Sequence, residues 1–254
     1  MITLKALTSY LDEQLNVAAF GHDYSNNGLQ VEGNASVRRA VFGVDASLAL
    51  FEAAAELQAD FIFVHHGLSW SAEPRRLTGL VARRYRTLFI NNLSLYAVHL
   101  PLDAHPRFGN NAVLADRLGL IDRRMFFQYA GSDIGILGRL PETAAAEALA
   151  RTLQHHLGGT PPQVFAGDRP VRRVAVISGG AGLDGLQCAI DAGAELLITG
   201  EIEHTMFHLI AESGIAVIGL GHYRSETTGV QAIRQLLQQE FGLIGHFVDL
   251  PTGL

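Results

Sequence analysis

The sequence predicts an α/β protein made of two related, intertwined halves with mainly parallel strands and a small β-α-β insertion. Three observations predict this class. Short apolar runs alternate with amphipathic stretches. Part of this alternating sequence is repeated later in the chain at a constant spacing. A segment with a different pattern separates the two copies of the repeat.

The first half begins the alternation between strands and helices. Its short apolar runs are typical of buried strands, and the stretches between them have apolar residues at helical spacing. The expected order is strand 40–44, helix 48–57, strand 60–64, helix 77–91 and strand 95–98. Because strands that alternate with helices pair in parallel through right-handed crossovers, we expect a mainly parallel sheet.

The middle of the chain follows another pattern. A strand at 134–137 and a helix at 143–157 precede a Gly/Pro turn at 158–162, which predicts a small inserted β-α-β layer. The expected division is therefore a first α/β half, an inserted layer, and a second α/β half. These segments are 1–125, 126–170 and 171–254.

An internal repeat links the two halves. Residues 41–67 align without gaps on residues 176–202, at a constant offset of 135 residues. Both copies then continue into another helix and a further strand, at 95–98 in the first and 216–220 in the second. We interpret the halves as related α/β units.

Composition excludes several classes of protein. The 254 residues are 48% apolar and 17% charged, as in globular proteins, and the net charge of −6 disfavours general nucleic-acid binding. Cys188 is the only cysteine, so an intrachain disulfide and a thiolate metal cage are excluded. No apolar run is long enough to span a membrane, and we expect a cytoplasmic protein.

Polar residues follow the expected strands. In a parallel sheet, the residues after each strand collect at one edge, where open α/β folds bind ligands. The polar residues at these positions are His65, His66, His99, Asp103, Gly200, Glu201, His222 and Glu226.

Imidazole and carboxylate together suit Zn, Mn, Fe, Co or Ni. His222 and Glu226 are four residues apart, so a helix would place both on one face. Successive side chains diverge on an extended backbone, so we expect His65 and His66 to address two ions, with Asp103 or Glu226 bridging them. A lone buried histidine is usually a core residue, but burying so many ionisable groups without an ion would be costly.

Other residues have two interpretations. His99 and His204 are candidate proton shuttles or metal-supporting residues, although an ordinary helix or loop role is as good an explanation. Gly180 lies in a glycine-rich turn that could cradle a phosphate but lacks a P-loop lysine, which favours a plain tight turn. Arg75 and Arg76 begin an arginine cluster, typical of a solvated helix face, that a phosphate-bearing substrate could use.

Several motifs together resemble one known family. They are NNGLQVEG (26–33), VHHG (64–67), HLPLDAH (99–105) followed by GNN (109–111), LLITGE (196–201) with His204, and GHYRSE (221–226). They resemble the NGG-interacting-factor-three-like family of dinuclear-metal proteins, also called GTP cyclohydrolase 1 type 2 homologues. The resemblance implies a duplicated α/β architecture, a ring-shaped homohexamer, and two metal ions held by His65, His66, Asp103, His222 and Glu226.

The expected function is hydrolysis that depends on two divalent transition-metal ions per chain. A hydroxide bridging the ions would attack a small molecule, such as a nucleotide or related heterocycle, while His99 or His204 protonates the leaving group. One alternative is a non-catalytic scaffold or regulatory interaction protein whose ions hold the two halves together. Another is metal storage or delivery.

Overall fold

Parallel strands form the centres of two sheets, each in its own part of the chain. The computed structural model describes residues 1–72 and 76–254. Its contacts group the chain into a first unit, Met1–Leu102 with Val230–Leu250, and a second unit, Asp103–Gly229 with Pro251–Leu254. The predicted segments 1–125, 126–170 and 171–254 remain a prediction from the sequence pattern.

The first unit has a five-stranded sheet in the order β13-β4-β5-β6-β2 and a small β1-β3 pair. Its elements are β1 (Ile2–Thr3), α1 (Leu4–Gln14), η1 (Val17–Phe20), β2 (Gly28–Val31), β3 (Ser36–Val37), β4 (Arg39–Asp45), α2 (Leu48–Glu56), β5 (Phe61–His66), α3 (Gly79–Ile90), β6 (Ser94–Ala97) and β13 (Ile244–Phe247). Strands β13, β4, β5 and β6 pair in parallel, and β2 is antiparallel to β6.

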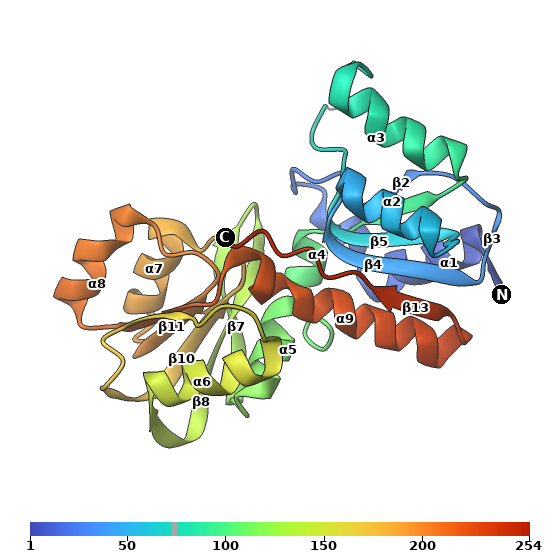
Figure 1. The fold of residues 1–254 in the computed structure, drawn as a ribbon. Helices are drawn as coiled ribbons and strands as arrows, with labels where there is room; N and C mark the ends of the chain where they lie inside the picture. Colours follow the sequence, from blue (N-terminus) through green and yellow to red (C-terminus); the bar gives the residue numbers. More distant parts are fainter. Residues whose placement is uncertain (73–75) are drawn as a thin grey trace. The chain divides into compact units, whose positions relative to one another are not determined.

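Side-chain alternation along β5 divides the core of this unit into two faces. Ile62 and Val64 pack with Leu50 of α2 and Leu88 of α3, and both helices lie on the same side of the sheet (Figure 1). The strand residues between them, such as Phe63, face the other side of the sheet. There the rings of Phe63 and Tyr96 stack with their centroids 5.8 Å apart. The last two residues of β5, His65 and His66, continue this alternation.

The second unit has a six-stranded sheet in the order β7-β8-β10-β11-β12-β9. Its elements are α5 (Asn110–Arg117), β7 (Ile121–Tyr129), β8 (Ser132–Ala145), α6 (Ala146–Leu157), β9 (Gln163–Phe165), β10 (Pro170–Ile177), α7 (Gly182–Asp191), β11 (Leu196–Thr199), η2 (His204–Met206), α8 (Phe207–Ser213) and β12 (Ala216–Gly219). Apolar residues of α5 and α6 cover one face of the sheet, and those of α7 and α8 cover the other.

The expectation of mainly parallel strands is correct for the first sheet, where β13, β4, β5 and β6 are parallel, but only for the centre of the second sheet. Strands β10, β11 and β12 are parallel, whereas β8 and β9 run antiparallel beside them. Segment 126–170 contains the expected strand, helix and strand, but its strands join the second sheet instead of forming their own layer. The cause is a tight hairpin between β7 and β8, whose two loop residues Ala130 and Gly131 both have positive φ, as a two-residue hairpin turn requires.

Two helices carry the chain from one unit to the other. The chain leaves the first unit within α4 (Leu100–Asp103) and returns to it within α9 (His222–Phe241). Asp103 and Glu226, both predicted metal ligands, therefore lie on the segments that join the units. Within residues 1–72 and 76–254, no helix has both the length and the apolar content needed to cross a bilayer.

Candidate metal centre

Three histidines come together at the carboxyl end of the first sheet. One ring nitrogen of each of His65, His66 and His99 lies within 4.8 Å of the others, close enough to share a metal ion. The ring centroids of His65 and His66 are 4.6 Å apart, closer than we expect from an extended backbone, and the assignment of these residues to two ions stays a prediction.

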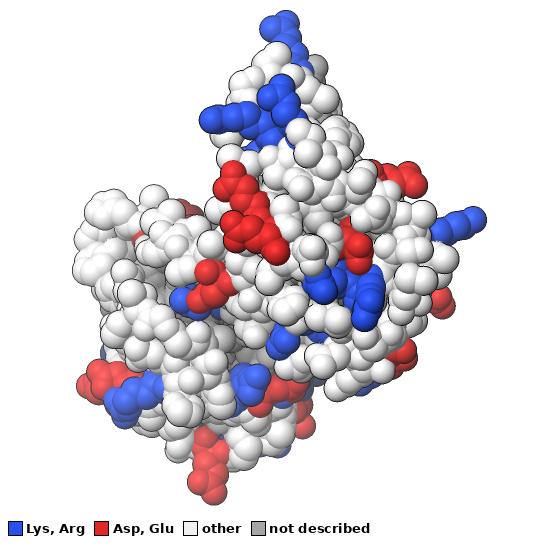
Figure 2. Space-filling view, turned by 45° about the vertical axis from the view of Figure 1, so that its right-hand side comes forward, with Lys and Arg blue, Asp and Glu red and all other residues white. Residues whose placement is uncertain are grey.

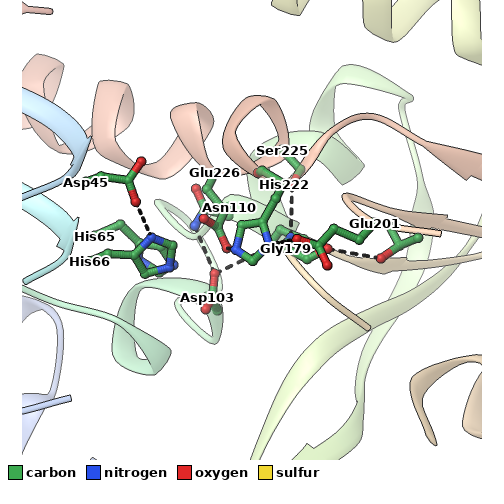
Figure 3. Close-up of polar contacts among 12 residues, drawn as sticks. Asp45, His65, His66, Asp103, Asn110, Gly179, Glu201, His222, Ser225 and Glu226 are labelled. Carbon is green, nitrogen blue, oxygen red and sulfur yellow. Dashed lines mark hydrogen bonds and ion pairs between the residues drawn. The ribbon is translucent and has the colours of Figure 1, made fainter. Parts of the chain in front are cut away.

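Each of these three rings is oriented through its Nδ1 atom. His65 Nδ1 bonds to the Val98 carbonyl oxygen at 2.9 Å. His66 Nδ1 bonds to Asp45 Oδ1 at 2.8 Å (Figure 3). His99 Nδ1 bonds to Asp23 Oδ1 at 2.9 Å. These oxygens accept hydrogen bonds, so each Nδ1 carries the proton and Nε2 is the nitrogen with the lone pair. This is the arrangement of histidines that bind metals through Nε2.

The loop before β2 fixes the position of His99. Asn27 Oδ1 accepts the backbone N–H of His99 at 2.7 Å, and Asp23 Oδ2 accepts the amide of Asn27 at 2.9 Å. Burial favours a higher pKa for Asp23, but the hydrogen bond and charge of His99, with further hydrogen bonds, lower its pKa below the usual value. Asp23 is therefore a negatively charged partner for His99.

Gln30 fixes the turn that follows the histidine pair. Its Oε1 accepts the N–H groups of Leu68 and Ser69, and its Nε2 donates to the Asn26 carbonyl. Gly67 leaves room for this side chain, because a Cβ there would lie 2.5 Å from the Ala97 Cβ and would also collide with Gln30. The NNGLQ motif thus acts by holding the loop after His66.

The second unit supplies a histidine and a carboxylate from one helix. The predicted i, i+4 pair is confirmed: His222 begins α9, and its Nε2 lies 3.2 Å from Glu226 Oε1. His222 Nδ1 bonds to Glu201 Oε1 at 2.6 Å (Figure 3). The hydrogen bond to Glu226, opposed by burial and supported by the charges of Glu226 and Glu201, raises the pKa of His222 to about 9.

This pKa predicts how pH changes the stability of metal-free protein. Because the folded-state pKa of His222 is raised from 6.5 to about 9, its protonated form stabilises the fold fully below pH 6.5. That contribution is lost as the pH rises through about 9. We expect the difference in free energy of unfolding between wild type and His222→Gln, measured in urea without metal, to shrink from pH 6 to pH 10. A difference that is constant over this range would contradict the assignment.

A second carboxylate lies beside Glu226. Asp103 is 6% exposed, and its Oδ1 accepts hydrogen bonds from Asn110 Nδ2 at 2.8 Å and Ser178 Oγ at 3.2 Å. Asp103 and Glu226 each have a carboxylate oxygen within 4.8 Å of the other. Two buried carboxylates at this separation favour a cation, because their negative charges repel each other without one.

Two N–H groups of the glycine-rich turn after β10 donate to side chains of the second unit. The N–H of Gly179 donates to Ser225 Oγ at 2.9 Å, and that of Ala181 donates to Thr199 Oγ1 at 3.3 Å. Gly179 has a φ of +65°, as a tight turn allows for glycine. These bonds favour the tight-turn interpretation over a phosphate cradle around Gly180.

The remaining predicted residues lie apart from these groups. His204 is exposed on η2 and, among the described residues, belongs to none of the histidine and carboxylate groups close enough to share an ion. Arg76 is exposed, and Arg75 lies outside the described residues. Lysine and arginine side chains gather at the top of the view in Figure 2, where α3 lies in Figure 1. A phosphate role for the two arginines stays a prediction.

A cleft lies beside Glu201, the hydrogen-bond partner of His222, in the second unit. Its volume is about 420 Å³. Its lining includes Gly200, Glu201, Glu203, Gly221 and Leu254. Glu201 therefore contacts His222 through one oxygen and borders a space large enough for part of a small molecule.

Three supporting residues were absent from the predicted site. Asp45 is the last residue of the strand β4, so the strand-end rule that selected His65 and His66 could have found it. Asp23 and Asn27 precede β2 in a polar loop, and no spacing in the sequence links them to His99. Only the folded chain brings this loop to the end of β6.

The chain resembles known proteins over its whole length. Its residues 2–250 match the family model for Duf34/NIF3 (NGG1p interacting factor 3). It is 43% identical to the GTP cyclohydrolase 1 type 2 homolog of Archaeoglobus fulgidus, with 100% of both chains covered, and 42% identical to that of Deinococcus radiodurans, with 98% and 93% covered.

Solved structures show the same fold. TTHA1606 from Thermus thermophilus has a TM-score of 0.88 at 42% identity, and protein ybgI, of unknown function, has a TM-score of 0.90 at 35% identity. Each comparison covers 100% of both chains. The family match and the relatives above 40% identity show that the chain belongs to the Duf34/NIF3 family.

Proposed function

We propose that the protein is a metal-dependent hydrolase that uses two divalent transition-metal ions per chain. In this proposal the ligands are the five residues that the family resemblance implies. They are His65, His66, Asp103, His222 and Glu226. The candidate metals are Zn, Mn, Fe, Co and Ni, because imidazole and carboxylate suit all of them.

One observation carries the proposal. Every histidine in the set has its Nδ1 engaged by an oxygen of its own unit: Val98 O for His65, Asp45 for His66 and Glu201 for His222. A core histidine needs no such consistent tautomer, whereas a metal-binding histidine needs its Nε2 lone pair directed at the ion. The residues therefore fit a metal centre by their donor chemistry.

The chain's own residues have distinct roles in this reaction. When bound, a pair of divalent ions lowers the pKa of water from about 15.7 toward about 7 and stabilises developing negative charge. His99, held by Asp23, is the better placed of the two predicted proton donors, because its ring lies 5.2 Å from that of His65. His204 is exposed and has no such placement.

The names of the relatives and the cleft support a proposal for the substrate class. The relatives carry the name GTP cyclohydrolase 1 type 2 homolog, and the cleft beside Glu201 has room for part of a small molecule. We propose a nucleotide or a related heterocycle with a hydrolysable carbon–nitrogen or phosphoester bond.

Metal analysis and a hydrolysis assay test the proposal separately. Protein purified without added metal is expected to carry about two transition-metal ions per chain. A panel of nucleotides and cyclic amides is then assayed with and without a chelator, which is expected to abolish turnover. Absence of stoichiometric metal contradicts the site, whereas metal without any turnover contradicts only the hydrolase.

A metal-dependent scaffold is the second candidate function. It is favoured by the position of Asp103 and Glu226 on α4 and α9, the helices that join the two units. In a scaffold, removing metal is expected to lower the melting temperature or change assembly. In a hydrolase, the fold remains and only turnover is lost.

We also propose a homohexamer, as the family resemblance implies. Exposed apolar side chains on and beside α3, including Leu77, Phe89 and Ile90, provide surface for contact between copies. The mass of the native protein in solution tests this proposal.

A further inference from the structure

Trp70 is a tryptophan held rigidly beside the histidine group of the first unit. Its Nε1–H donates to the Gly67 carbonyl at 2.9 Å, which fixes the indole over the turn that follows His66. The backbone at Trp70 pairs with Ser25 in an antiparallel bridge, and the N–H of Ser71 donates to the Tyr24 carbonyl at 2.6 Å. The indole is thus anchored through both its ring nitrogen and its backbone.

The indole forms one wall of the histidine group. Its centroid lies 5.1 Å from that of His99 at an interplanar angle of 70°, an edge-to-face contact, and 6.1 Å from that of His66. Both imidazoles are themselves fixed through Nδ1. An aromatic surface and two oriented imidazoles therefore share one corner of the unit.

The indole remains partly exposed, although the aromatic residues of the neighbouring strands β5 and β6 are buried. Phe61, Phe63 and Tyr96 have 0% exposure, whereas Trp70 is of intermediate burial. Tyr24, next to the bridge partner Ser25, is 61% exposed. Aromatic surface left open beside a polar group is typical of a site that a ligand covers.

We propose that Trp70 is the stacking surface for a planar heterocycle, which lies against the indole with its reacting group toward His66 and His99. This inference rests on the proposed function and specifies which residue recognises the ring of the substrate. A flat, polarisable indole face binds flat aromatic rings of many kinds through stacking. A ribose phosphate, which lacks a flat aromatic ring, would gain much less from it.

The chain offers a direct test, because Trp70 is its only tryptophan. Intrinsic tryptophan fluorescence of the metal-loaded full chain therefore reports on this position alone. The probes are guanosine, adenosine, cytidine and uridine, with ribose 5-phosphate as the non-aromatic control. We expect at least one nucleoside to quench the emission saturably and ribose 5-phosphate to leave it unchanged. If no nucleoside quenches, or if ribose 5-phosphate quenches equally, the proposal is overturned.

Two variants distinguish the effect of losing a flat ring from the effect of losing apolar volume. Trp70→Phe keeps a flat ring, and Trp70→Leu keeps apolar volume without one. By calorimetry, we expect Trp70→Leu to bind the nucleoside roughly 5-fold to 100-fold more weakly than wild type and Trp70→Phe to stay within a few-fold. Equal binding by wild type and Trp70→Leu overturns the proposal.

Metal content separates this result from the proposed function. Both variants are expected to carry as much metal as wild type, because Trp70 offers no metal-binding atom. If wild type carries metal and shows no nucleoside binding, the stacking role fails and the metal centre stands. If wild type carries no metal, the proposed function fails, and fluorescence with the nucleosides still decides the stacking role.

Discussion

Glu226→Gln is expected to purify with at most one metal ion per chain, where wild type carries about two. Glu226 is 3% exposed, lies one turn after His222 on α9, and has an oxygen within 4.8 Å of an Asp103 oxygen. Glutamine keeps the size of the side chain but removes its negative charge and one anionic oxygen. The proposed centre would then lose both a ligand and part of the charge that balances the cations. Elemental mass spectrometry of the purified protein measures the metal content.

Glu240→Gln is the matched control for this experiment. Glu240 lies on the same helix but is exposed, so the same chemical change there should leave the metal content of the protein unchanged. Circular dichroism of both variants checks that α9 remains folded. A Glu226→Gln protein that retains two ions per chain would rule out Glu226 as a ligand.

The central strands and helices could be predicted because local pattern and tertiary structure agree there. The offset of 135 residues carries Phe61, the first residue of β5, onto Leu196, the first residue of β11. It also carries Glu56, the last residue of α2, onto Asp191, the last residue of α7. Buried central strands appear in the sequence as short apolar runs, so both copies of the internal repeat show the same pattern.

The edges of the sheets could not be predicted in the same way. Strand β7 is mostly exposed, so it lacks the apolar run that marks a central strand. Strand β8 is 14 residues long, but only its middle is buried, and the sequence marks only 134–137. Antiparallel pairing of these strands depends on the hairpin at Ala130-Gly131, whose first residue is not among the usual turn formers.

Candidate site residues that directly follow a strand could be predicted from the sequence. Supporting residues that reach the site from loops could not. His65, His66 and His222 follow apolar runs that end abruptly, and the sheet-edge rule selects them. The acceptors that orient the rings are less visible. Asp23 lies 76 residues before His99, and a backbone carbonyl such as that of Val98 has no sequence signature at all.

Gly200→Ala is expected to destabilise the second unit and to abolish metal binding together. Gly200 follows β11, and a Cβ there would lie 2.5 Å from the Gly179 carbonyl oxygen and 2.8 Å from the Cα of His222. Both atoms belong to the backbone, so neither can move without shifting the turn after β10 or the first turn of α9. Overpacking of this kind costs about 1–3 kcal/mol, and each kcal/mol lowers the melting temperature of a chain of this size by about 2–4 °C.

Gly21→Ala provides the control, since a Cβ at Gly21 meets no atom within 4 Å and its φ is −64°. That variant is expected to melt at the wild-type temperature or slightly above it, because alanine reduces the conformational entropy of the unfolded chain. Thermal melts and metal analysis of both variants show whether Gly200→Ala lowers the melting temperature and the metal content. A Gly200→Ala protein that melts like wild type would show that the strand end and the start of α9 can separate without cost. Loss of metal beyond what the change in melting temperature explains would show that the position of His222 depends on this close approach.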